Sequence, residues 1–323
     1  MKIGKLEETL KKAIKYTDRS IYIEGPIGVG KTETINRIAE MEGYDIVNIP
    51  IETMEFYDFK MNKIENGKMR SYYNEDLPDD EPVGTYGLLV FEDLTASDRQ
   101  TVYAVMNFLL TGKIGNYVLP KRWKMISTGN REEDGILTPI PKVVKTRMLV
   151  LTVNYSVEDF SKYILKKYKN SKNAMLVASY AKMRNNVLVD VTPRVLESII
   201  KLPFKRELIE GQLGDYTDDF LNYVKSSKKL NEIKTAILNN NFKDIVVDNE
   251  YQFLTALMLR TIINKAYKEK NKALLTNIYN FAEYKLNLEV VAFIARQIVE
   301  ETPEMLNMKE IVNLIKLTGL DKI

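Results

Sequence analysis

Eight residues near the start of the chain, Gly25 to Thr32, have the types and spacing that bind phosphate. They read Gly-Pro-Ile-Gly-Val-Gly-Lys-Thr, fit G-x-x-x-x-G-K-[ST] at every fixed position, and follow an apolar run at residues 21–23. Glycines let successive backbone N–H groups point at phosphate oxygens. We expect Lys31 to reach the β- and γ-phosphates of a nucleotide and Thr32 to ligate Mg²⁺. The residues expected to surround the nucleotide are Gly25, Pro26, Ile27, Gly28, Val29, Gly30, Lys31, Thr32 and Glu33.

The residues after the loop predict a helix from about Thr32 to Glu40, whose amino-terminal end would point at the same anions. A cation such as Lys31 in a first helical turn opposes the helix dipole unless an anion joins it. The alternative is a chance glycine turn between a strand and a helix. Four fixed positions recur by chance in a chain of this length roughly once in a hundred. The pattern therefore favours a phosphate-binding loop.

Two adjacent acids, Glu92 and Asp93, follow the continuously apolar residues 88–91. An uninterrupted apolar run is typical of a strand buried on both faces. Phosphate-loop enzymes place at such a strand end the acid that holds the Mg²⁺ shell, and often a second acid that polarises water. We therefore predict Glu92 as a metal-side ligand and Asp93 as the catalytic base. The alternative is a pair of acids that only solvates a strand end.

Strand patterns alternate with helical patterns over the first half of the chain. This alternation predicts an α/β fold with a parallel sheet and crossover helices. The expected helix at 6–16 has its apolar residues on one face, and the expected strands lie at 21–23, 44–49, 88–91, 123–128 and 148–153. From about residue 154 helical patterns dominate, at 157–167, 174–183 and 193–201 and then throughout 227–323, with turns at 239–241 and 302–303.

Local signals refine these elements. Asn66-Gly67 predicts a hairpin inside the long polar segment after the second strand, and residues 112–120 predict a second, tighter hairpin. Ser97 and Gln100 have the spacing of a capping box for the next helix. In the later helical region, Thr192 is a good N-cap and Pro193 a good first helical residue, which places Arg194 in a first turn.

Composition limits the available chemistry. The chain has 323 residues, 45% hydrophobic and 28% charged, with a net charge of +3, which gives no global argument for nucleic-acid binding. It has no cysteine and no histidine, so disulfides, thiol or imidazole nucleophiles and Cys/His zinc sites are excluded. Carboxylates and a bound metal remain, which suits phosphoryl transfer to water. No apolar leader or membrane-length run is present, so a cytoplasmic protein is expected.

Six segments in order resemble the MoxR-type AAA+ ATPases, a dynein-related group often paired with von Willebrand factor A domain proteins. The segments that carry the resemblance are Gly25–Thr32, Phe91–Leu94, Leu110–Pro120, Ser127–Gly135, Lys145–Met148 and Val191–Arg194. The resemblance implies a P-loop AAA+ core over 1–153, with an insert at about 59–82, then a helical lid over 154–226. A C-terminal helical region over 227–323 would follow.

The resemblance also implies roles for three further polar residues. Asn130 matches the sensor I residue that orients the attacking water, Arg147 the arginine finger offered to a neighbouring subunit, and Arg194 the sensor II residue of the lid that reaches bound phosphate. A finger that acts in trans implies a ring, a hexamer in this family. The alternatives are a turn residue for Asn130, a solvated strand-edge charge for Arg147 and a surface helix residue for Arg194.

Our leading hypothesis is a Mg²⁺-dependent ATPase that remodels or helps assemble a protein client, as a MoxR-like chaperone. ATP is preferred over GTP because no Asn-Lys-x-Asp motif occurs. The family usually has Asp then Glu where this chain has Glu92 then Asp93. That reversal motivates a second hypothesis, a nucleotide-gated assembly scaffold with slow or no hydrolysis. A third, a nucleic-acid motor or loader, depends on the basic run from Arg260 to Lys272, for which a solvated helix face is the alternative.

Overall fold

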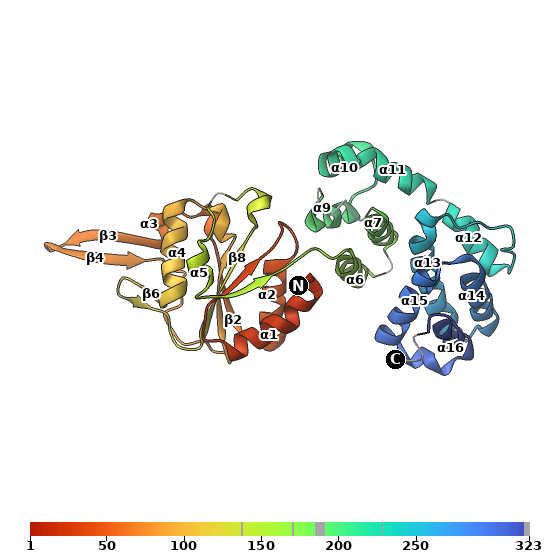
Figure 1. Cartoon of the computed structure of the whole chain (residues 1–323), viewed down its shortest axis with the longest axis horizontal. Coiled ribbons are helices and arrows are strands. Elements are labelled where there is room, and N and C mark those ends of the chain that lie inside the picture. The colour runs from red at the N-terminus through yellow and green to blue at the C-terminus, as the bar shows by residue number, and fades with distance from the viewer. Residues whose placement is uncertain (137, 170, 185–190, 228, 320–323) are drawn as a thin grey trace. The chain divides into compact units, whose positions relative to one another are not determined.

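The computed structural model describes residues 1–136, 138–169, 171–184, 191–227 and 229–319. The chain divides into two compact units, Met1–Asp159 and Phe160–Ile323, and Figure 1 shows both. Sheet and helices make up the first unit, and helices make up the described part of the second. The expected boundaries at 153/154 and 226/227 stay predictions.

A five-stranded parallel sheet forms the centre of the first unit, as the alternating pattern predicts. Its strand order is β2-β5-β8-β1-β9, and all four strand pairs are parallel. The strands are β1 (Ile21–Glu24), β2 (Asp45–Pro50), β5 (Gly87–Glu92), β8 (Trp123–Gly129) and β9 (Leu149–Thr152). The helices of this unit are α1 (Leu6–Tyr16), α2 (Lys31–Glu42), α3 (Phe56–Phe59), α4 (Arg99–Thr111) and α5 (Lys142–Lys145).

Alternate residues of β5 belong to two different apolar cores. Leu88 and Val90 belong to the cluster that also contains the buried residues of α1 and α2. Leu89 and Phe91 belong to the cluster that contains those of α4. Successive side chains of a strand point to opposite faces, so an uninterrupted apolar run is what a strand covered on both sides requires. The sheet therefore lies between two helical layers, and its polar strand ends stay at the edge.

The amino-terminal end of α4 differs from the expected capping box. Asp98, not Ser97, is the N-cap, and its carboxylate accepts hydrogen bonds from the backbone N–H groups of Gln100 and Thr101. Asp98 can cap because its backbone is extended just before the first helical turn. The Ser97 hydroxyl instead donates to the carbonyl of Met54 at 3.5 Å.

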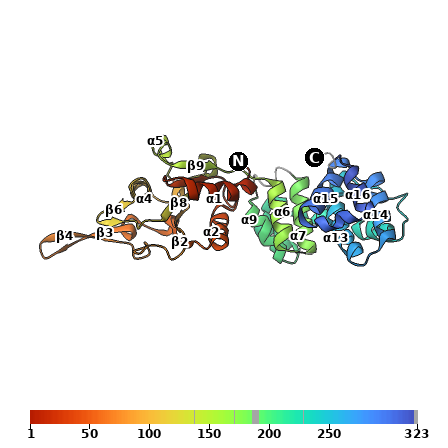
Figure 2. The same cartoon turned by 90° about the horizontal axis from the view of Figure 1, so that it is seen from below.

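Both expected hairpins are confirmed. Strands β3 (Lys60–Glu65) and β4 (Lys68–Tyr73) pair antiparallel around Asn66 and Gly67, whose φ angles of 51° and 72° are those of a two-residue hairpin turn with both residues left-handed. Strands β6 (Lys113–Ile114) and β7 (Tyr117–Val118) form the shorter hairpin. The β3–β4 hairpin projects from the body of the first unit in both Figure 1 and Figure 2.

The second unit contains the helices that the later sequence predicts. Its first helices are α6 (Val157–Lys167), α7 (Lys172–Met183) and α9 (Pro193–Ser198), and α10 (Arg206–Leu213) and α11 (Thr217–Ser226) follow. Then come α12 (Lys229–Leu238), α13 (Gln252–Lys268), α14 (Lys272–Lys285), α15 (Leu288–Glu301) and α16 (Lys309–Lys316). The turns expected at 239–241 and 302–303 are confirmed, because α12 and α15 end directly before them. Within the described residues, no helix combines the length and apolar character that a membrane crossing requires.

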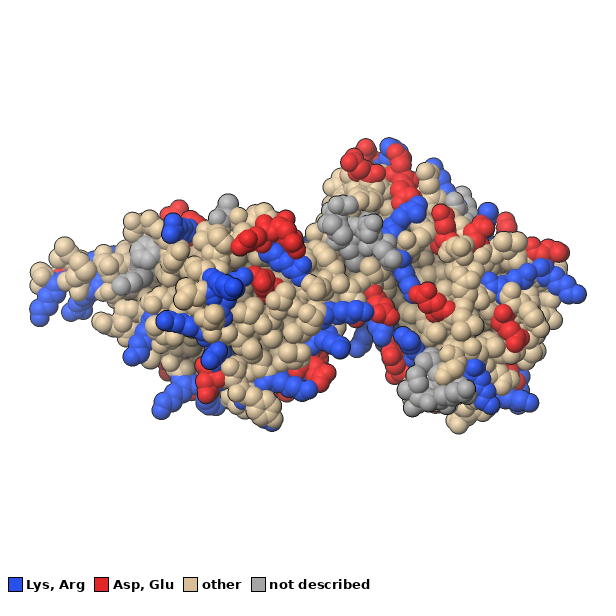
Figure 3. Space-filling model, in the orientation of Figure 1, with Lys and Arg blue, Asp and Glu red and all other residues tan. Residues whose placement is uncertain are grey.

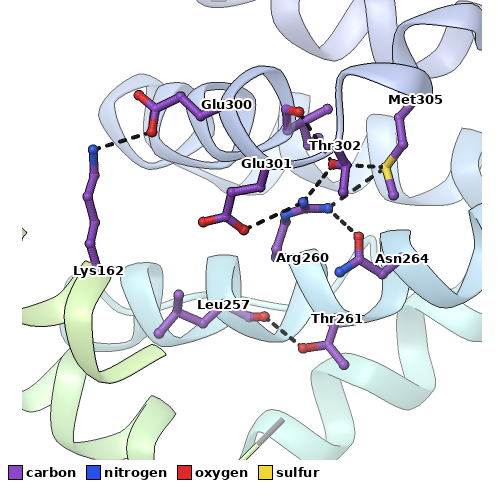
Figure 4. A network of polar contacts seen from close by, with 10 residues as sticks. Lys162, Leu257, Arg260, Thr261, Asn264, Glu300, Glu301, Thr302 and Met305 are labelled. Atoms are coloured by element: carbon purple, nitrogen blue, oxygen red, sulfur yellow. Dashed lines mark hydrogen bonds and ion pairs between the residues drawn. The ribbon is translucent and has the colours of Figure 1, made fainter. Parts of the chain in front are cut away.

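Arg260 does not belong to a basic surface, contrary to the interpretation of the run that it begins. Its residue is 7% exposed, and Nη2 donates to the hydroxyl of Thr302 at 2.8 Å while Nη1 donates to Asn264. Figure 4 shows the guanidinium between α13 and the segment after α15, with Glu301 at 4.0 Å. A stem of three methylenes lets an arginine pack inside while the ends of its guanidinium reach acceptors. Nε of Arg260 is buried without a hydrogen-bond partner among the described residues. This cation therefore joins two segments of the second unit.

Candidate functional site

The phosphate loop connects β1 to α2, as the spacing predicts. Gly28 and Gly30 have φ angles of 69° and 96°, a region that side chains with a Cβ seldom adopt. Gly25 is required for a different reason: a Cβ there would lie 2.9 Å from the carbonyl oxygen of Val153. The sequence therefore forms the loop because each of these glycines meets a steric demand.

The side chain of Lys31 lies folded into the loop and is buried, at 6% exposure. Its Nζ donates to the carbonyl oxygens of Gly25 at 2.8 Å and Pro26 at 2.9 Å, and to Oδ1 of Asn130 at 2.9 Å. A buried ammonium needs such oxygen partners, since burial of an unpaired charge is costly. Phosphate oxygens are stronger acceptors than carbonyls, so an anion that enters the loop can take over these bonds.

Asn130 directly follows β8, and its side chain reaches Lys31 across the edge of the sheet. Its backbone N–H donates to the hydroxyl of Thr95 at 2.8 Å. β8 lies between β5 and β1 in the sheet, so its end lies between the acids and the phosphate loop. The structure thus brings Asn130 to the place that the sequence predicts, and its role with water stays a prediction.

Glu92 and Asp93 lie half-buried at the end of β5, beside β8. Asp93 has φ 48° and ψ 44°, a left-handed conformation that Asp adopts more readily than Glu. Its backbone N–H donates to the hydroxyl of Thr128 at 3.0 Å. The local backbone therefore gives a physical reason for the order Glu then Asp: the second acid must fit a left-handed position.

Thr95 and Thr128 are residues of this site that the sequence patterns do not predict. Both are buried, at 1% and 0% exposure, and each hydroxyl accepts a bond from the backbone of the other strand end. Thr128 holds Asp93, and Thr95 holds Asn130. These two bonds fix the acid and the amide relative to each other. Each threonine lies two positions from a strand-end polar residue, but that spacing does not show which backbone group of the neighbouring segment its hydroxyl accepts from.

The donor set fits a magnesium ion held together with a nucleotide. Thr32 is half-buried in the first turn of α2, and Glu92 ends β5. Mg²⁺ prefers hard oxygen ligands and usually takes only one or two from the protein, the rest coming from phosphates and water. Within the described residues, no group of three or more acids gathers as a self-sufficient metal site. A hydroxyl and a carboxylate suit a metal that arrives with phosphate.

The remaining loop residues differ in exposure. Val29 is buried, Ile27 is 42% exposed, and Glu33 is exposed on α2. The carbonyls of Gly25, Pro26 and Ile27 accept bonds, the last from the hydroxyl of Tyr155 at 2.6 Å. Burial raises the pKa of Tyr155 to about 12, so this hydroxyl stays a donor at neutral pH. This hydrogen bond connects the phosphate loop at Ile27 to Tyr155, near the end of the first unit.

The two arginines named by resemblance are both exposed. Arg147 lies between α5 and β9 in the first unit, and its side chain has no hydrogen bond or ion pair among the residues described. Arg194 lies on α9 in the second unit. Thr192 caps that helix by accepting from the N–H of Val195, and Pro193 is its first residue, as predicted. The catalytic roles of both arginines stay predictions.

Comparison with known proteins yields only distant structural similarity. No family model matches the chain, and no curated protein matches it. NtrX from Brucella abortus in complex with ATP aligns with 99% of this chain and 68% of its own at 13% identity and a TM-score of 0.40. The same protein in complex with ADP aligns with 98% of this chain and 68% of its own, at 14% identity and a TM-score of 0.38. A DNA polymerase III gamma subunit-related protein from Thermotoga maritima aligns over 97% of both chains at 12% identity and a TM-score of 0.34.

At these identities and scores, the class of this chain is defined by its own fold and site. A parallel sheet carries a glycine loop with a buried lysine at one strand end and two acids at another. Ligands of open α/β sheets bind beyond the carboxyl ends of the strands. The chain has a P-loop α/β core followed by a helical C-terminal region.

Proposed function

We propose that the protein binds Mg·ATP at the phosphate loop and hydrolyses it as an AAA+ ATPase. The observation that carries this proposal is the position of Lys31, whose Nζ lies between two loop carbonyls and Asn130. One cation is thus held among replaceable acceptors, beside glycines that leave room for phosphate. A structural lysine has no need of such a loop, whereas a phosphate-binding lysine does.

The strand-end residues divide the chemistry among them. Thr32 and Glu92 would hold Mg²⁺, which neutralises charge on the phosphates. Asp93 would accept a proton from the attacking water, and Asn130 would orient that water. Phosphoryl transfer relies mainly on such positioning and on electrostatic stabilisation. Arg147 would complete the site of a neighbouring copy, and Arg194 would reach phosphate from the helical region.

The finer proposal is a MoxR-like ring, a hexamer, that acts on a protein client in the cytoplasm. Support for the protein client, and for that part of the proposal alone, comes from the β3–β4 hairpin, on which Ile64 and Met69 face each other across the strands and are 77% and 72% exposed. Exposed apolar pairs favour contact with protein. The opposite face carries Lys63 and Arg70, also directly paired in register. Figure 3 shows Lys and Arg side chains at this projecting end of the first unit.

The face with Lys63 and Arg70 already carries an anion, because Glu65 lies 3.7 Å from Arg70. The exposed apolar pair is therefore the feature of the hairpin that fits a protein client. A von Willebrand factor A domain protein is the client class that the sequence resemblance suggests. The structure weakens the case for a nucleic-acid motor or loader that the basic run from Arg260 to Lys272 suggested. Arg260 is buried, and Lys265 of the same run pairs with Glu269 at 3.7 Å.

Phosphate release from ATP by the purified protein tests the proposal. We expect Mg²⁺-dependent turnover that Lys31→Ala abolishes, and no comparable loss in Lys15→Ala, which alters an exposed lysine of α1. Mass photometry with and without ATP tests the ring. Absence of phosphate release together with an unchanged nucleotide affinity in Lys31→Ala would contradict the enzyme proposal.

A second candidate, the nucleotide-gated scaffold, is favoured by one observation, the reversed acid pair. Asp93 has a shorter side chain than the usual Glu, and a general base must come within about 3 Å of its water. The scaffold would bind ATP, assemble and release it unchanged. Tight ATP binding and ring formation with negligible phosphate release would establish it.

A further inference from the structure

Lys145 and Glu24 form a partly buried ion pair beside the phosphate loop. Lys145 is the last residue of α5, and Glu24 is the last residue of β1, directly before Gly25. The ammonium contacts Oε1 of Glu24 and lies 5.6 Å from the centre of the Tyr22 ring. The two side chains are only 29% and 19% exposed. Neither has a part in the phosphate chemistry described above.

The pair fixes the backbone on one side of Arg147, two residues further along the chain. On the other side, Met148 is 4% exposed, and the N–H of Leu149 donates to the carbonyl of Ser20 at 2.9 Å. Ser20 directly precedes β1, and Glu24 is its last residue. The segment that carries Arg147 is therefore attached at both ends to the strand that leads into the phosphate loop.

Arg147 itself is left unattached. Its side chain is exposed and makes no ion pair or hydrogen bond within the described part of the chain. Because the backbone of this cation is already fixed, only side-chain freedom is lost when it meets an anion from another molecule. The arrangement suits an arginine that is presented outward and held in place by its neighbours.

The phosphate loop and the ion pair are also adjacent in the chain, because Glu24 directly precedes Gly25. The carbonyl of Gly25 accepts from Lys31 at 2.8 Å, and its N–H donates to the carbonyl of Gly129 at 3.2 Å. When Lys31 turns to a phosphate it releases the Gly25 carbonyl, one residue from Glu24. The position of the carboxylate that holds Lys145 is thus set by the same strand end that carries the loop.

We propose that the Lys145–Glu24 ion pair is the positioning contact that holds Arg147 ready for the nucleotide of a neighbouring copy of this chain. The inference rests on the proposed function, because it requires Arg147 to act in trans. Lys145 is a positioning residue, since it touches no nucleotide and acts through Arg147. Glu24 connects that action to the phosphate loop of the same copy.

Turnover and ATP affinity measured on single variants test the first part. We expect Lys145→Met to lower kcat by about 10-fold or more, because small misplacements of a catalytic group are costly. Its Kd for a fluorescent ATP analogue and its thermal midpoint should stay close to those of the wild type. Lys142→Met, which alters an exposed lysine of the same helix, is the matched control and should leave kcat unchanged.

Mixed assemblies test the direction of the effect. Asp93→Asn chains lack the base but keep Lys145 and Arg147, so they can serve a neighbour's site. We expect Asp93→Asn chains to restore turnover in assemblies with Lys145→Met chains. We expect the same restoration in assemblies with Arg147→Ala chains. Within one chain, the exchanged pair Lys145→Glu with Glu24→Lys should recover turnover that Lys145→Glu alone loses.

The outcomes separate the two proposals. If Arg147→Ala turns over like the wild type, trans catalysis fails, and the inference fails with it. If Arg147→Ala is inactive and is rescued by Asp93→Asn chains, the ring proposal holds. In that case wild-type kcat in Lys145→Met, or a loss that mixing does not rescue, overturns the inference alone and leaves the ion pair a structural role.

Discussion

Nζ of Lys31 and Oδ1 of Asn130 lie 2.9 Å apart, although the two residues are 99 positions apart in the sequence. The bond joins the first residue of α2 to the residue that follows β8. It links the phosphate loop to the end of β8, the strand that pairs with β1. Because the amide oxygen is the acceptor here, the amide nitrogen of Asn130 keeps its donor capacity for other partners.

This bond predicts different effects for its two ends. Lys31→Met should abolish detectable ATP binding, because it removes the cation from the loop. Asn130→Ala should keep the Kd for ATP within about 3-fold and lower kcat by about 100-fold, the usual size of effect when one polar group is removed from a transition state. Titration with a fluorescent nucleotide and steady-state turnover measure the two quantities.

Asn130→Asp provides a second comparison, since the acceptor to Lys31 remains while the amide donor is lost and a negative charge is added. We expect this variant to bind ATP more weakly than Asn130→Ala, because a carboxylate repels the γ-phosphate. Equal kcat in Asn130→Ala and the wild type would remove Asn130 from the catalytic machinery.

The left-handed backbone at Asp93 leads to a second prediction. Asp93→Glu should lower the free energy of unfolding by about 1 kcal/mol, because residues other than Gly, Asn and Asp fit this region poorly. Asp93→Asn should lose activity without that cost. Trp123 is the only tryptophan and lies in the first unit, so its fluorescence in urea reports the unfolding of this unit.

Exchange of the acids, Glu92→Asp with Asp93→Glu, then distinguishes the two functions. For an ATPase adapted to the present order, we expect turnover to fall, since Glu at position 93 shifts the backbone that Thr128 holds. A sharp rise in turnover would instead support the assembly scaffold, in which the present order limits hydrolysis.

Motifs with short spacing were predictable from the sequence, and contacts between distant residues were not. The loop, the helix at Leu6–Tyr16 and the Asn66-Gly67 turn depend on local steric demands and on periodicity, which the sequence displays directly. Strand-end acids could be placed because a parallel sheet collects its carboxyl ends at one edge. The fold class therefore followed from local patterns.

The errors and omissions have a common physical cause. Ser97 and Asp98 are both good caps, and only the backbone conformation decides that Asp98 caps α4. Arg260 resembles a surface cation until tertiary packing supplies Thr302 as a partner. The hydroxyls of Thr95 and Thr128 accept from the backbone N–H groups of Asn130 and Asp93, contacts that no spacing along the chain reveals. Each case depends on contacts that exist only once the chain is folded.

The cap of α4 predicts a dependence of stability on pH. Hydrogen bonds from the Thr101 side chain, and from the backbone N–H groups of Thr101 and Gln100, lower the pKa of Asp98 below its ordinary 3.8. A lowered pKa in the folded state means that the stabilisation is complete above the ordinary value and is lost as the pH falls through the lowered one. Asp98→Ala should cost about 1 kcal/mol at pH 7.

Asp98→Asn isolates this effect, because asparagine caps a helix equally well without a titrating group. The difference in unfolding free energy between the wild type and Asp98→Asn should be constant at neutral pH and change only below about pH 4. Urea unfolding followed by Trp123 fluorescence at several pH values measures it. A difference that changes between pH 5 and 8 would contradict the assignment.

The final prediction concerns Tyr22 and Gly129, which lie on the paired strands β1 and β8. The Tyr22 hydroxyl is buried and has no hydrogen-bond partner among the described residues, and burial raises the pKa of this group, so it stays protonated. Tyr22→Phe should therefore be neutral or stabilising by up to about 1 kcal/mol, since it removes an unsatisfied polar group. Tyr103→Phe, at an exposed tyrosine of α4, is the matched control.

Gly129→Ala should be destabilising by about 1–3 kcal/mol, because a Cβ there would lie 2.4 Å from the Tyr22 hydroxyl and 2.9 Å from Cε2 of its ring. Only the first of these contacts disappears in Tyr22→Phe. The double variant should therefore recover part of the loss, and a double-mutant cycle in urea should give a coupling energy of at least about 0.5 kcal/mol. Strict additivity of the two changes would show that the strand ends move apart instead, and Asn130 would then move with Gly129.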